Sequence, residues 1–338
     1  MKLARMFHVS LVTINGFVLA AALTLSLPFD AGAQTTKITV GQSGINPGTS
    51  LHFLAQKENL FAKYGLDVKI IPTTSPSMVQ AMLGGSMQIA TSAPGVPFVT
   101  ATLEGAPPFA VVSSWVNVFY YTIVSRKEIT SPKELKGKTG QVGASFGSLP
   151  DVALRFGLTK FGLDPEKDVK LIQMPRVDWA NVIAQVEKGD IQFAILPPPY
   201  DRLGEKRGFR SLISLPDLGI PWQADGEWVL KSYLKTDRDV VLRFVKAIAD
   251  AMGVYYHQKE KTLTYLTEFM GTTDRQDTEY AYEMFAKWSD RVPMPKAESL
   301  RTIMDAIKKT TPKAASGDPA SFIDASIVDQ LTREGYFR

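Results

Sequence analysis

The 338-residue chain contains no cysteine and only three histidines. Without cysteine it can form no disulfide framework, no thiolate metal site and no cysteine nucleophile. No Walker A, G-x-S-x-G or H-E-x-x-H motif occurs, and no His/Asp/Glu group has metal-ligand spacing. The sequence therefore predicts no metal, no cofactor and no catalytic residues, which favours a protein that is not an enzyme.

Strong charge of one sign is also missing. The chain has 38 Lys and Arg against 34 Asp and Glu, a net charge of +4 at neutral pH. The charges are interspersed, and no basic run or arginine–aromatic alternation occurs, so nucleic-acid binding is not expected. After the N-terminal region, nothing approaches the roughly 20 apolar residues that a helix needs to cross a bilayer.

The N-terminal region resembles a secretory signal. Lys2 and Arg5 precede an apolar stretch from Val9 to Leu27, and Ala31-Gly32-Ala33 offers the small residues that a signal peptidase recognises. The alternative is an uncleaved anchor, which is disfavoured because polar residues dilute the apolar stretch and no basic stop-transfer cluster follows it. We expect residues 1–33 to be removed, with Gln34 as the mature start, and the protein to reside in the periplasm.

A strand–helix–strand–helix–strand unit follows. Residues 37–42 predict a strand, 50–64 a helix and 67–72 a second strand. Ser75-Pro76 is typical of a helix start, with serine as N-cap and proline in the first turn, and Gly84-Gly85 ends that helix. Residues 87–91 predict the third strand.

The same order recurs about a hundred residues later. The predicted strands are 139–143, 168–174 and 191–196, and the predicted helices are 150–161 and the segment from Asp178 to Gly189. The two copies also share sequence similarity, since GSMQIA near residue 87 parallels GDIQFA near residue 191. Alternating strands and helices imply parallel strands with right-handed crossovers, so each copy predicts a mostly parallel sheet flanked by helices.

Two such copies predict an α/β protein with two lobes. Ligands on open α/β sheets bind beyond the carboxyl ends of the strands, so six post-strand loops should meet at one cleft. Residues 109–114 predict a further strand, and after residue 230 the pattern is helical, which predicts a tail packed on the N-terminal lobe. The expected division is a signal peptide at 1–33, the first part of lobe 1 at 34–118, lobe 2 at 119–225, and the return to lobe 1 at 226–338.

The post-strand loops are rich in hydroxyl groups, which suit a polar or anionic ligand at helix N-termini. A single serine there is more often a cap or a turn residue, so the prediction depends on convergence of the set. The crossovers and loops also carry aromatic residues that could stack on a planar ligand, whereas hinge packing is favoured for Phe119 and Tyr121. The predicted ligand-binding residues are Ser43, Asn46, Thr74, Ser75, Ser77, Ser92, Trp115, Tyr120, Ser145, Ser148, Arg176, Trp179 and Tyr200.

Several segments together resemble a known family. They are the duplicated unit, S-x-x-N-P-G-T after the first strand, SPSMVQAMLGG after the second, and LAQKENLFAKYGLDV at residues 54–68. These are similar to the SsuA/THI5-like (NMT1-like) substrate-binding proteins of nitrate/sulfonate/taurine-type ABC importers. The likeness covers about residues 37–250, and the chain departs from the pattern at Pro197-Pro198-Pro199.

The resemblance implies a type II periplasmic-binding-protein fold and a monomer that delivers a small organic anion, such as a sulfonate, carboxylate or nitrate-like solute, to an inner-membrane ABC permease. Carried over by position, the family's ligand contacts fall on Ser43, Ser75, Ser77, Ser92, Ser145 and Ser148, with Trp115 near the hinge. One alternative is a protein that binds a pyrimidine or another aromatic ligand. Another is an enzyme that makes a thiamine pyrimidine precursor, with His52 as the histidine donor. A sensor that docks on a receptor is the remaining alternative.

Overall fold

The computed structural model describes residues 35–174 and 178–337. The expected signal peptide and Arg176 lie outside the described residues, so both stay predictions. Within the described part, no helix is long and apolar enough to cross a membrane.

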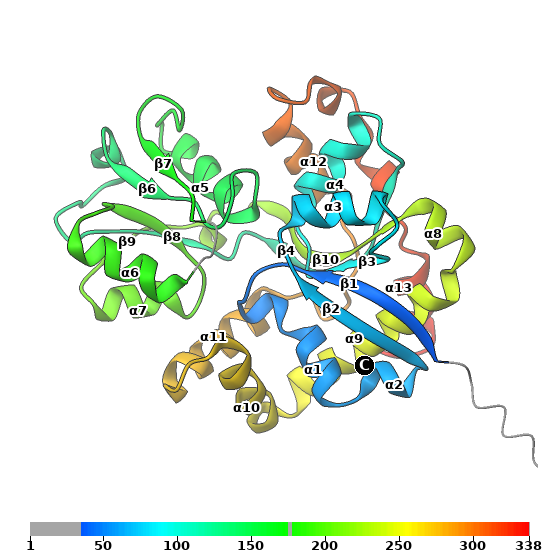
Figure 1. Ribbon diagram of the computed structural model, residues 1–338. Coiled ribbons are helices and arrows are strands. Elements are labelled where there is room, and N and C mark those ends of the chain that lie inside the picture. The colour runs from blue at the N-terminus through cyan, green and yellow to red at the C-terminus, as the bar shows by residue number, and fades with distance from the viewer. Residues whose placement is uncertain (1–34, 175–177, 338) are drawn as a thin grey trace, which may run out of the picture. The chain divides into compact units, whose positions relative to one another are not determined.

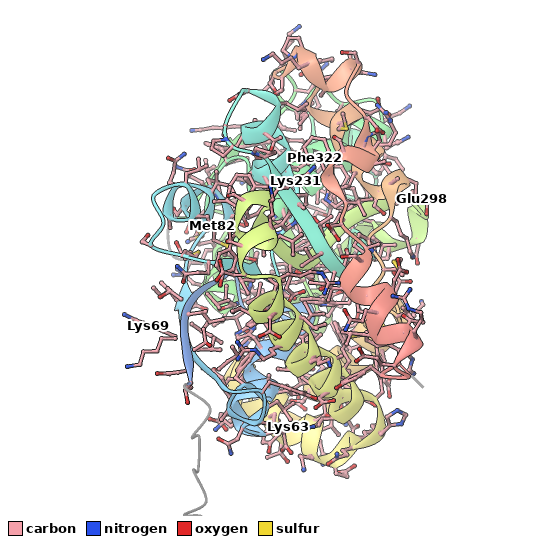
Figure 2. All side chains as sticks on the ribbon, turned by 90° about the vertical axis from the view of Figure 1, so that its right-hand side faces the viewer. Lys63, Lys69, Met82, Lys231, Glu298 and Phe322 are labelled. Carbon is pink, nitrogen blue, oxygen red and sulfur yellow. The ribbon has the colours of Figure 1, made fainter. Side chains whose placement is uncertain are left out.

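The first sheet has five strands in the order β2-β1-β3-β10-β4 (Figure 1). The strands are β1 (Thr36–Gln42), β2 (Leu66–Pro72), β3 (Ile89–Thr91), β4 (Phe109–Val118) and β10 (Pro221–Leu230). β1 pairs in parallel with both β2 and β3, whereas β10 is antiparallel to β3 and β4. The edge strand β2 is open on its outer side, and Lys69 extends outward from it (Figure 2).

The second sheet repeats this topology in the order β7-β6-β8-β5-β9. Its strands are β5 (Thr122–Ser125), β6 (Thr139–Gln141), β7 (Lys170–Ile172), β8 (Phe193–Leu196) and β9 (Arg210–Ser214). β6 is parallel to β7 and β8, and β5 is antiparallel to β8 and β9. The predicted duplication is therefore confirmed, and each copy is completed by an antiparallel strand from elsewhere in the chain, so both sheets are mixed.

Helices cover both faces of the first sheet (Figure 1). The helices from the first copy are α1 (Leu51–Lys57), α2 (Leu60–Lys63), α3 (Ser75–Leu83) and α4 (Val96–Leu103). α1 and α2 pack with α9 (Arg238–His257) on one face, and α3 and α4 pack with α12 (Ala297–Ile307) on the other. Because β1 and β3 lie inside the sheet between two helical layers, their apolar residues are almost entirely buried.

In the second sheet, α5 (Leu149–Lys160) contacts β8, and α6 (Trp179–Lys188) and α7 (Tyr200–Lys206) pack together. Alternation along the strands divides the core. Val124, Ala194 and Leu196 join the α6 residues in one cluster, while Ile123, Phe193 and Ile195 belong to the main core. Successive side chains on a strand point to opposite faces, which explains the division.

The helical tail packs on the first sheet, as predicted. Its remaining helices are α8 (Lys231–Thr236), α10 (Lys259–Met270), α11 (Arg275–Trp288) and α13 (Ser326–Arg333). α13 contacts both β4 and α9, and α10 contacts α1. Short 3-10 turns complete the chain at η1 (Pro47–Thr49), η2 (Pro132–Leu135), η3 (Pro216–Leu218), η4 (Pro312–Ala315) and η5 (Pro319–Phe322).

Three local expectations were wrong. The helix expected at 50–64 is broken, because Asn59 adopts a left-handed conformation with φ 55° between α1 and α2. Thr74 rather than Ser75 is the N-cap of α3. The stretch from Pro216 to Trp228 was not predicted as a strand, yet most of it forms β10, which runs across the expected lobe boundary at 225/226.

Candidate functional site

One cavity of about 540 Å³ collects residues from all six post-strand loops. The first copy contributes Ser43, Gly44, Ile45 and Asn46 after β1, Pro72, Thr73, Thr74 and Ser75 at the end of β2, and Pro94 after β3. The second copy contributes Ala144, Ser148, Leu149 and Pro150 after β6, Asp178 and Trp179 after β7, and Tyr200 after β8. Tyr120, Tyr121 and Met270 complete the wall. The volume lies in the range that holds a small organic molecule.

The loop after β1 is fixed by its own hydrogen bonds. Ser43 Oγ donates to the carbonyl oxygen of Ser92 at 2.6 Å, which ties the loops after β1 and β3 together. Asn46 Oδ1 accepts from the Gly48 amide at 2.8 Å, and Asn46 Nδ2 donates to the Tyr120 hydroxyl at 3.2 Å. The loop and the Tyr120 side of the cavity are therefore held in one arrangement before any ligand arrives.

Trp115 does not line the cavity, contrary to the sequence-based expectation. Its side chain is fully buried, and its indole Nε1 donates to the Gly48 carbonyl oxygen at 3.0 Å. The residue lies in β4, whose residues Phe109 to Asn117 are buried on both faces of the strand. Its contribution is to support the loop after β1 from behind. Ser92 is likewise buried, with φ 50°, and is not among the residues that line the cavity.

Two helices present open N-termini at the cavity. The N-caps of α3 and α5 are Thr74 and Ser148, but neither side chain caps its own helix. Thr74 Oγ1 instead pairs with Ser77 Oγ at 2.9 Å, and Ser148 Oγ donates to the Ser145 carbonyl oxygen at 2.6 Å. First-turn amides have no acceptor within a helix, so these uncapped ends offer N–H groups and a partial positive charge to an anion.

The third helix at the cavity, α6, differs. Asp178 Oδ1 accepts from the Ala180 amide at 3.0 Å and from the Asn181 amide at 3.4 Å. These amides are therefore already satisfied, and the cap itself carries a negative charge. Among the described lining residues, Asp178 is the only one with a carboxyl group, and none is Lys or Arg. An anion is therefore favoured at α3 and α5 rather than at α6.

Aromatic side chains form the rest of the wall. The rings of Tyr120 and Tyr121 stack with centroids 4.6 Å apart, and Trp179 and Tyr200 lie at 6.3 Å. Tyr121, for which packing was favoured from sequence, thus lines the cavity together with Tyr120. Such surfaces accept a planar or apolar group by stacking and area burial.

The structure brings eight of the thirteen predicted site residues to this cavity. These are Ser43, Asn46, Thr74, Ser75, Tyr120, Ser148, Trp179 and Tyr200. Ser77 is exposed in the first turn of α3, and the Ser145 hydroxyl is buried within the loop after β6. Whether any of the thirteen contacts a ligand stays a prediction.

Two buried carboxyl groups behind the cavity were not anticipated. Glu227 on β10 accepts hydrogen bonds from the Thr91 hydroxyl at 2.9 Å and from the Ser113 hydroxyl. Asp225 lies two residues earlier, close to Gly48, and neither of its oxygens has a hydrogen-bond partner within the described residues. A sequence signal existed, because two acids occur between Trp222 and Trp228 in a stretch with little other charge.

Burial dominates the ionisation of this pair. It raises the pKa of Glu227 to about 8, and the hydrogen bonds from Ser113 and Thr91 offset only part of that shift. Burial, and next the charge of Glu227, raise the pKa of Asp225 well above its usual range. Desolvation disfavours the charged form of an acid, so both groups hold protons at pH values where ordinary carboxyl groups have lost them.

His52 is buried in α1 rather than exposed to the cavity. Burial lowers its pKa to about 3, and its ring lies edge-on to Phe269 at 5.7 Å. It is not among the residues that line the cavity. Across residues 35–174 and 178–337, no group of three His, Asp or Glu residues is arranged to hold a metal ion.

Comparison with known proteins gives a consistent picture. Residues 46–261 match the model of the NMT1/THI5 like family. The candidate binding protein YtlA of Bacillus subtilis (strain 168) is 26% identical over 314 residues, covering 86% of this chain and 90% of YtlA.

Two solved structures show the same fold at low identity. The alkanesulfonate-binding protein SsuA of Xanthomonas axonopodis pv. citri, bound to MOPS, is 16% identical with a TM-score of 0.68, covering 87% of this chain and all of SsuA (100%). The periplasmic nitrate-binding protein NrtA of Synechocystis PCC 6803 is 14% identical with a TM-score of 0.67, covering 89% of each chain. The fold is therefore the two-lobed periplasmic-binding-protein fold.

Proposed function

Since the chain belongs to the NMT1/THI5-like family, we propose that it is a periplasmic solute-binding protein that captures a small organic anion and delivers it to an ABC importer. The observation that carries the proposal is the convergence of all six post-strand loops on one cavity, with two uncapped helix N-termini in its wall. The names of SsuA and NrtA, which share the fold, support the same role.

The cavity favours a sulfonate or carboxylate with an organic body over nitrate. Its volume is about 540 Å³, whereas one water molecule takes about 30 Å³ in the liquid, and nitrate is only a few times larger than water. The α3 and α5 ends suit the anionic group, and Tyr120, Tyr121, Trp179 and Tyr200 provide apolar area for the rest of the molecule.

Capture needs no chemistry on the ligand. A ligand held by one sheet's loops gains further contacts when the other sheet's loops close over it, and only such differential affinity shifts a conformational equilibrium. The two crossovers that connect the sheets, from β4 to β5 and from β9 to β10, are the segments about which closure would occur. Small-angle scattering should show a smaller radius of gyration with ligand bound.

A second candidate ligand is a neutral aromatic molecule such as a pyrimidine. The stacked Tyr120–Tyr121 pair and the Asp178 carboxylate favour it, since a carboxylate accepts hydrogen bonds from ring N–H groups. A thermal-shift screen separates the two candidates, because a ligand that binds the native state alone raises the melting temperature. The screen compares methanesulfonate, benzenesulfonate, benzoate, nitrate and cytosine.

A charge placed at the open end of α3 tests the anion site. Ser75→Asp should leave the fold intact, because an acid in the first turn stabilises a helix. Like charges about 4 Å apart repel by several kcal/mol at the protein surface, so benzenesulfonate should bind about a hundredfold more weakly by calorimetry. Ser86→Asp, on an exposed residue outside the cavity, is the control. Unchanged benzenesulfonate affinity in Ser75→Asp would refute the α3 site.

A further inference from the structure

A set of contacts joins the second sheet to the helical tail, away from the two crossovers. It connects α7, which packs on β5 and β9, with α11, which packs on α10 and β4. We call it the α7–α11 latch, and its residues are Asp201, Arg202 and Lys206 of α7 with Asp274, Asp277 and Tyr280 at the start of α11.

The latch is a polar interface with matched spacing. Lys206 Nζ lies 2.6 Å from Asp277 Oδ1 and 3.2 Å from Asp274 Oδ2. Tyr280, three residues after Asp277 and so on the same face of α11, donates its hydroxyl proton to Asp201 Oδ2 at 3.1 Å. The guanidinium of Arg202 lies 5.3 Å from the centre of the Tyr280 ring. Each of the three α7 side chains therefore has a partner on α11.

Asp201 links the latch to the sheet as well. The Thr122 hydroxyl of β5 donates to the same oxygen, Asp201 Oδ2, at 3.2 Å, and the side chain is almost fully buried. A buried carboxylate that lost the Tyr280 hydroxyl would keep a single side-chain donor, so separation of α7 from α11 has a cost in free energy. The contact is consequently more than an incidental meeting of surface charges.

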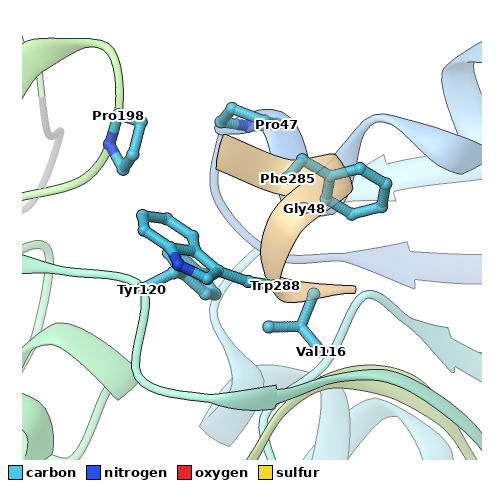
Figure 3. Close-up of a pocket in the computed structure, with 7 residues that line it drawn as sticks. All are labelled: Pro47, Gly48, Val116, Tyr120, Pro198, Phe285 and Trp288. Carbon is cyan, nitrogen blue, oxygen red and sulfur yellow. The ribbon is translucent and has the colours of Figure 1, made fainter. Parts of the chain in front are cut away.

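The latch is adjacent to the cavity wall in the chain. Tyr200 lines the cavity, and the next residue, Asp201, begins the contact with α11. The other end of α11 borders the same region. Phe285 and Trp288 form a small apolar pocket with Tyr120 and with Pro198, which lies two residues before Tyr200 (Figure 3). α11 therefore contacts α7 at its start and, at its end, lines a pocket together with Pro198.

We propose that the α7–α11 latch holds the two sheets in the arrangement in which both of them line the cavity, and that Lys206 and Tyr280 act as positioning residues that set ligand affinity without touching the ligand. The inference about affinity rests on the proposed binding function, but the inference about the arrangement of the sheets does not. If the competent arrangement is populated only in part, the apparent dissociation constant rises in inverse proportion to that part.

The expected effects differ between the two residues. Lys206→Met removes an ion pair whose lysine is about one-third exposed. The equilibrium constant between the latched and the open arrangement should therefore shift about threefold towards the open one. Tyr280→Phe removes a hydrogen bond to a buried carboxyl group and should shift it about tenfold. The apparent dissociation constant for benzenesulfonate should rise by up to the same factors, which are reached when the competent arrangement is the minor population.

The test uses the protein without ligand. Because the chain has no cysteine, spin labels can be placed specifically at Gln80→Cys on α3 and Phe146→Cys in the loop after β6, both of which are exposed. Double electron–electron resonance then measures the distance between α3 beside the first sheet and the loop after β6 of the second sheet. We expect longer distances in Lys206→Met and Tyr280→Phe than in the labelled parent.

Two matched controls lie on α11 itself. Lys287→Met removes an exposed charge, and Tyr282→Phe removes a hydroxyl from a ring stacked on Tyr255, with neither residue in the latch. Both should leave the distance unchanged. An unchanged distance distribution in Lys206→Met, an exposed substitution that the fold tolerates, would overturn the latch. If the distance were longer in the two variants but the parent did not bind benzenesulfonate, the latch would stand and the proposed ligand class would be rejected.

Discussion

The two sheets share one topology but differ at an equivalent buried position. In the second sheet, Ile123 of β5 pairs with Ile195 of β8, and both are fully buried. The corresponding residues of the first sheet are Glu227 of β10 and Thr91 of β3, also fully buried, and joined by a hydrogen bond. The same backbone arrangement is therefore built once with an apolar pair and once with a carboxyl group.

This difference shows that the fold itself does not require a carboxyl group at this position of β10 or β5. Glu227 is accommodated because Thr91 and Ser113 supply hydroxyl donors, whereas Ile123 packs against Gly157 of α5 and pairs with Ile195 and Ile213. Burial of a polar group is tolerated only where partners satisfy it. The polar cluster of β10 is thus a local feature of the first sheet, beside the Tyr120 end of the cavity.

Transfer of the carboxyl group to the second sheet should have the largest effect. Ile123→Glu places an acid among Ile195, Ile213 and Gly157, and we expect a loss of about 5 kcal/mol or more of stability, or failure to fold, at pH 7. Urea denaturation followed by circular dichroism measures the loss. Ile123→Leu, which conserves volume, should cost less than about 1.5 kcal/mol. A stable Ile123→Glu protein would show that the two positions are chemically equivalent after all.

Removal of the carboxyl group from the first sheet should produce a pH-dependent effect. The pKa of Glu227 is raised from 4.5 to about 8 by burial, so its contribution to stability is present in full below pH 4.5 and is lost as the pH rises to about 8. Three and a half pKa units correspond to at most about 5 kcal/mol. Glu227→Gln lacks this loss, so its stability relative to the parent should rise between pH 5 and pH 8.5.

Urea midpoints at several pH values measure that difference. Thr91 and Ser113 do not titrate in this range and are the same in both proteins. Asp225 does titrate, and because the charge of Glu227 helps to raise its pKa, the measured difference includes the loss of that coupling. Glu104→Gln, on an exposed residue at the end of α4, controls for the loss of one surface charge. A constant difference between Glu227→Gln and the parent from pH 5 to pH 8.5 would contradict the assigned ionisation.

The repeated architecture could be predicted because it depends on local patterns. Strands β1, β2 and β3, with their matches β6, β7 and β8, alternate with helices, and a glycine in the left-handed region follows the helical segment in each of these connections. By contrast, β10 was missed. Its sequence, PWQADGEWVL, carries buried Gln223, Asp225 and Glu227, and only tertiary contacts with β3 and β4 make a strand of it.

The sequence predicts where the site lies better than it predicts which side chains line it. Because post-strand loops of parallel sheets meet at one edge, Ser43, Ser75, Ser148 and Tyr200 could be placed near one another from sequence. The direction in which Trp115 points could not, since it depends on its register in β4. The latch could not be predicted either, because Lys206 and Asp277 are 71 residues apart and meet only through the packing of the tail.

The helix N-termini at the cavity give the last comparison, between uncapped α3 and α5 and capped α6. Asp178→Ala removes the cap of α6 and the carboxylate in the wall, which should cost about 1 kcal/mol of stability in urea. Because the α6 amides become available and a negative charge leaves the cavity, calorimetry should show benzenesulfonate binding a few times more tightly. Asp318→Ala, which removes the cap of η5 outside the cavity, should lower stability without changing affinity. If Asp178→Ala instead weakened the binding of cytosine, the carboxylate would be a ligand contact, and the difference between capped and uncapped helices would favour the pyrimidine over the organic anion.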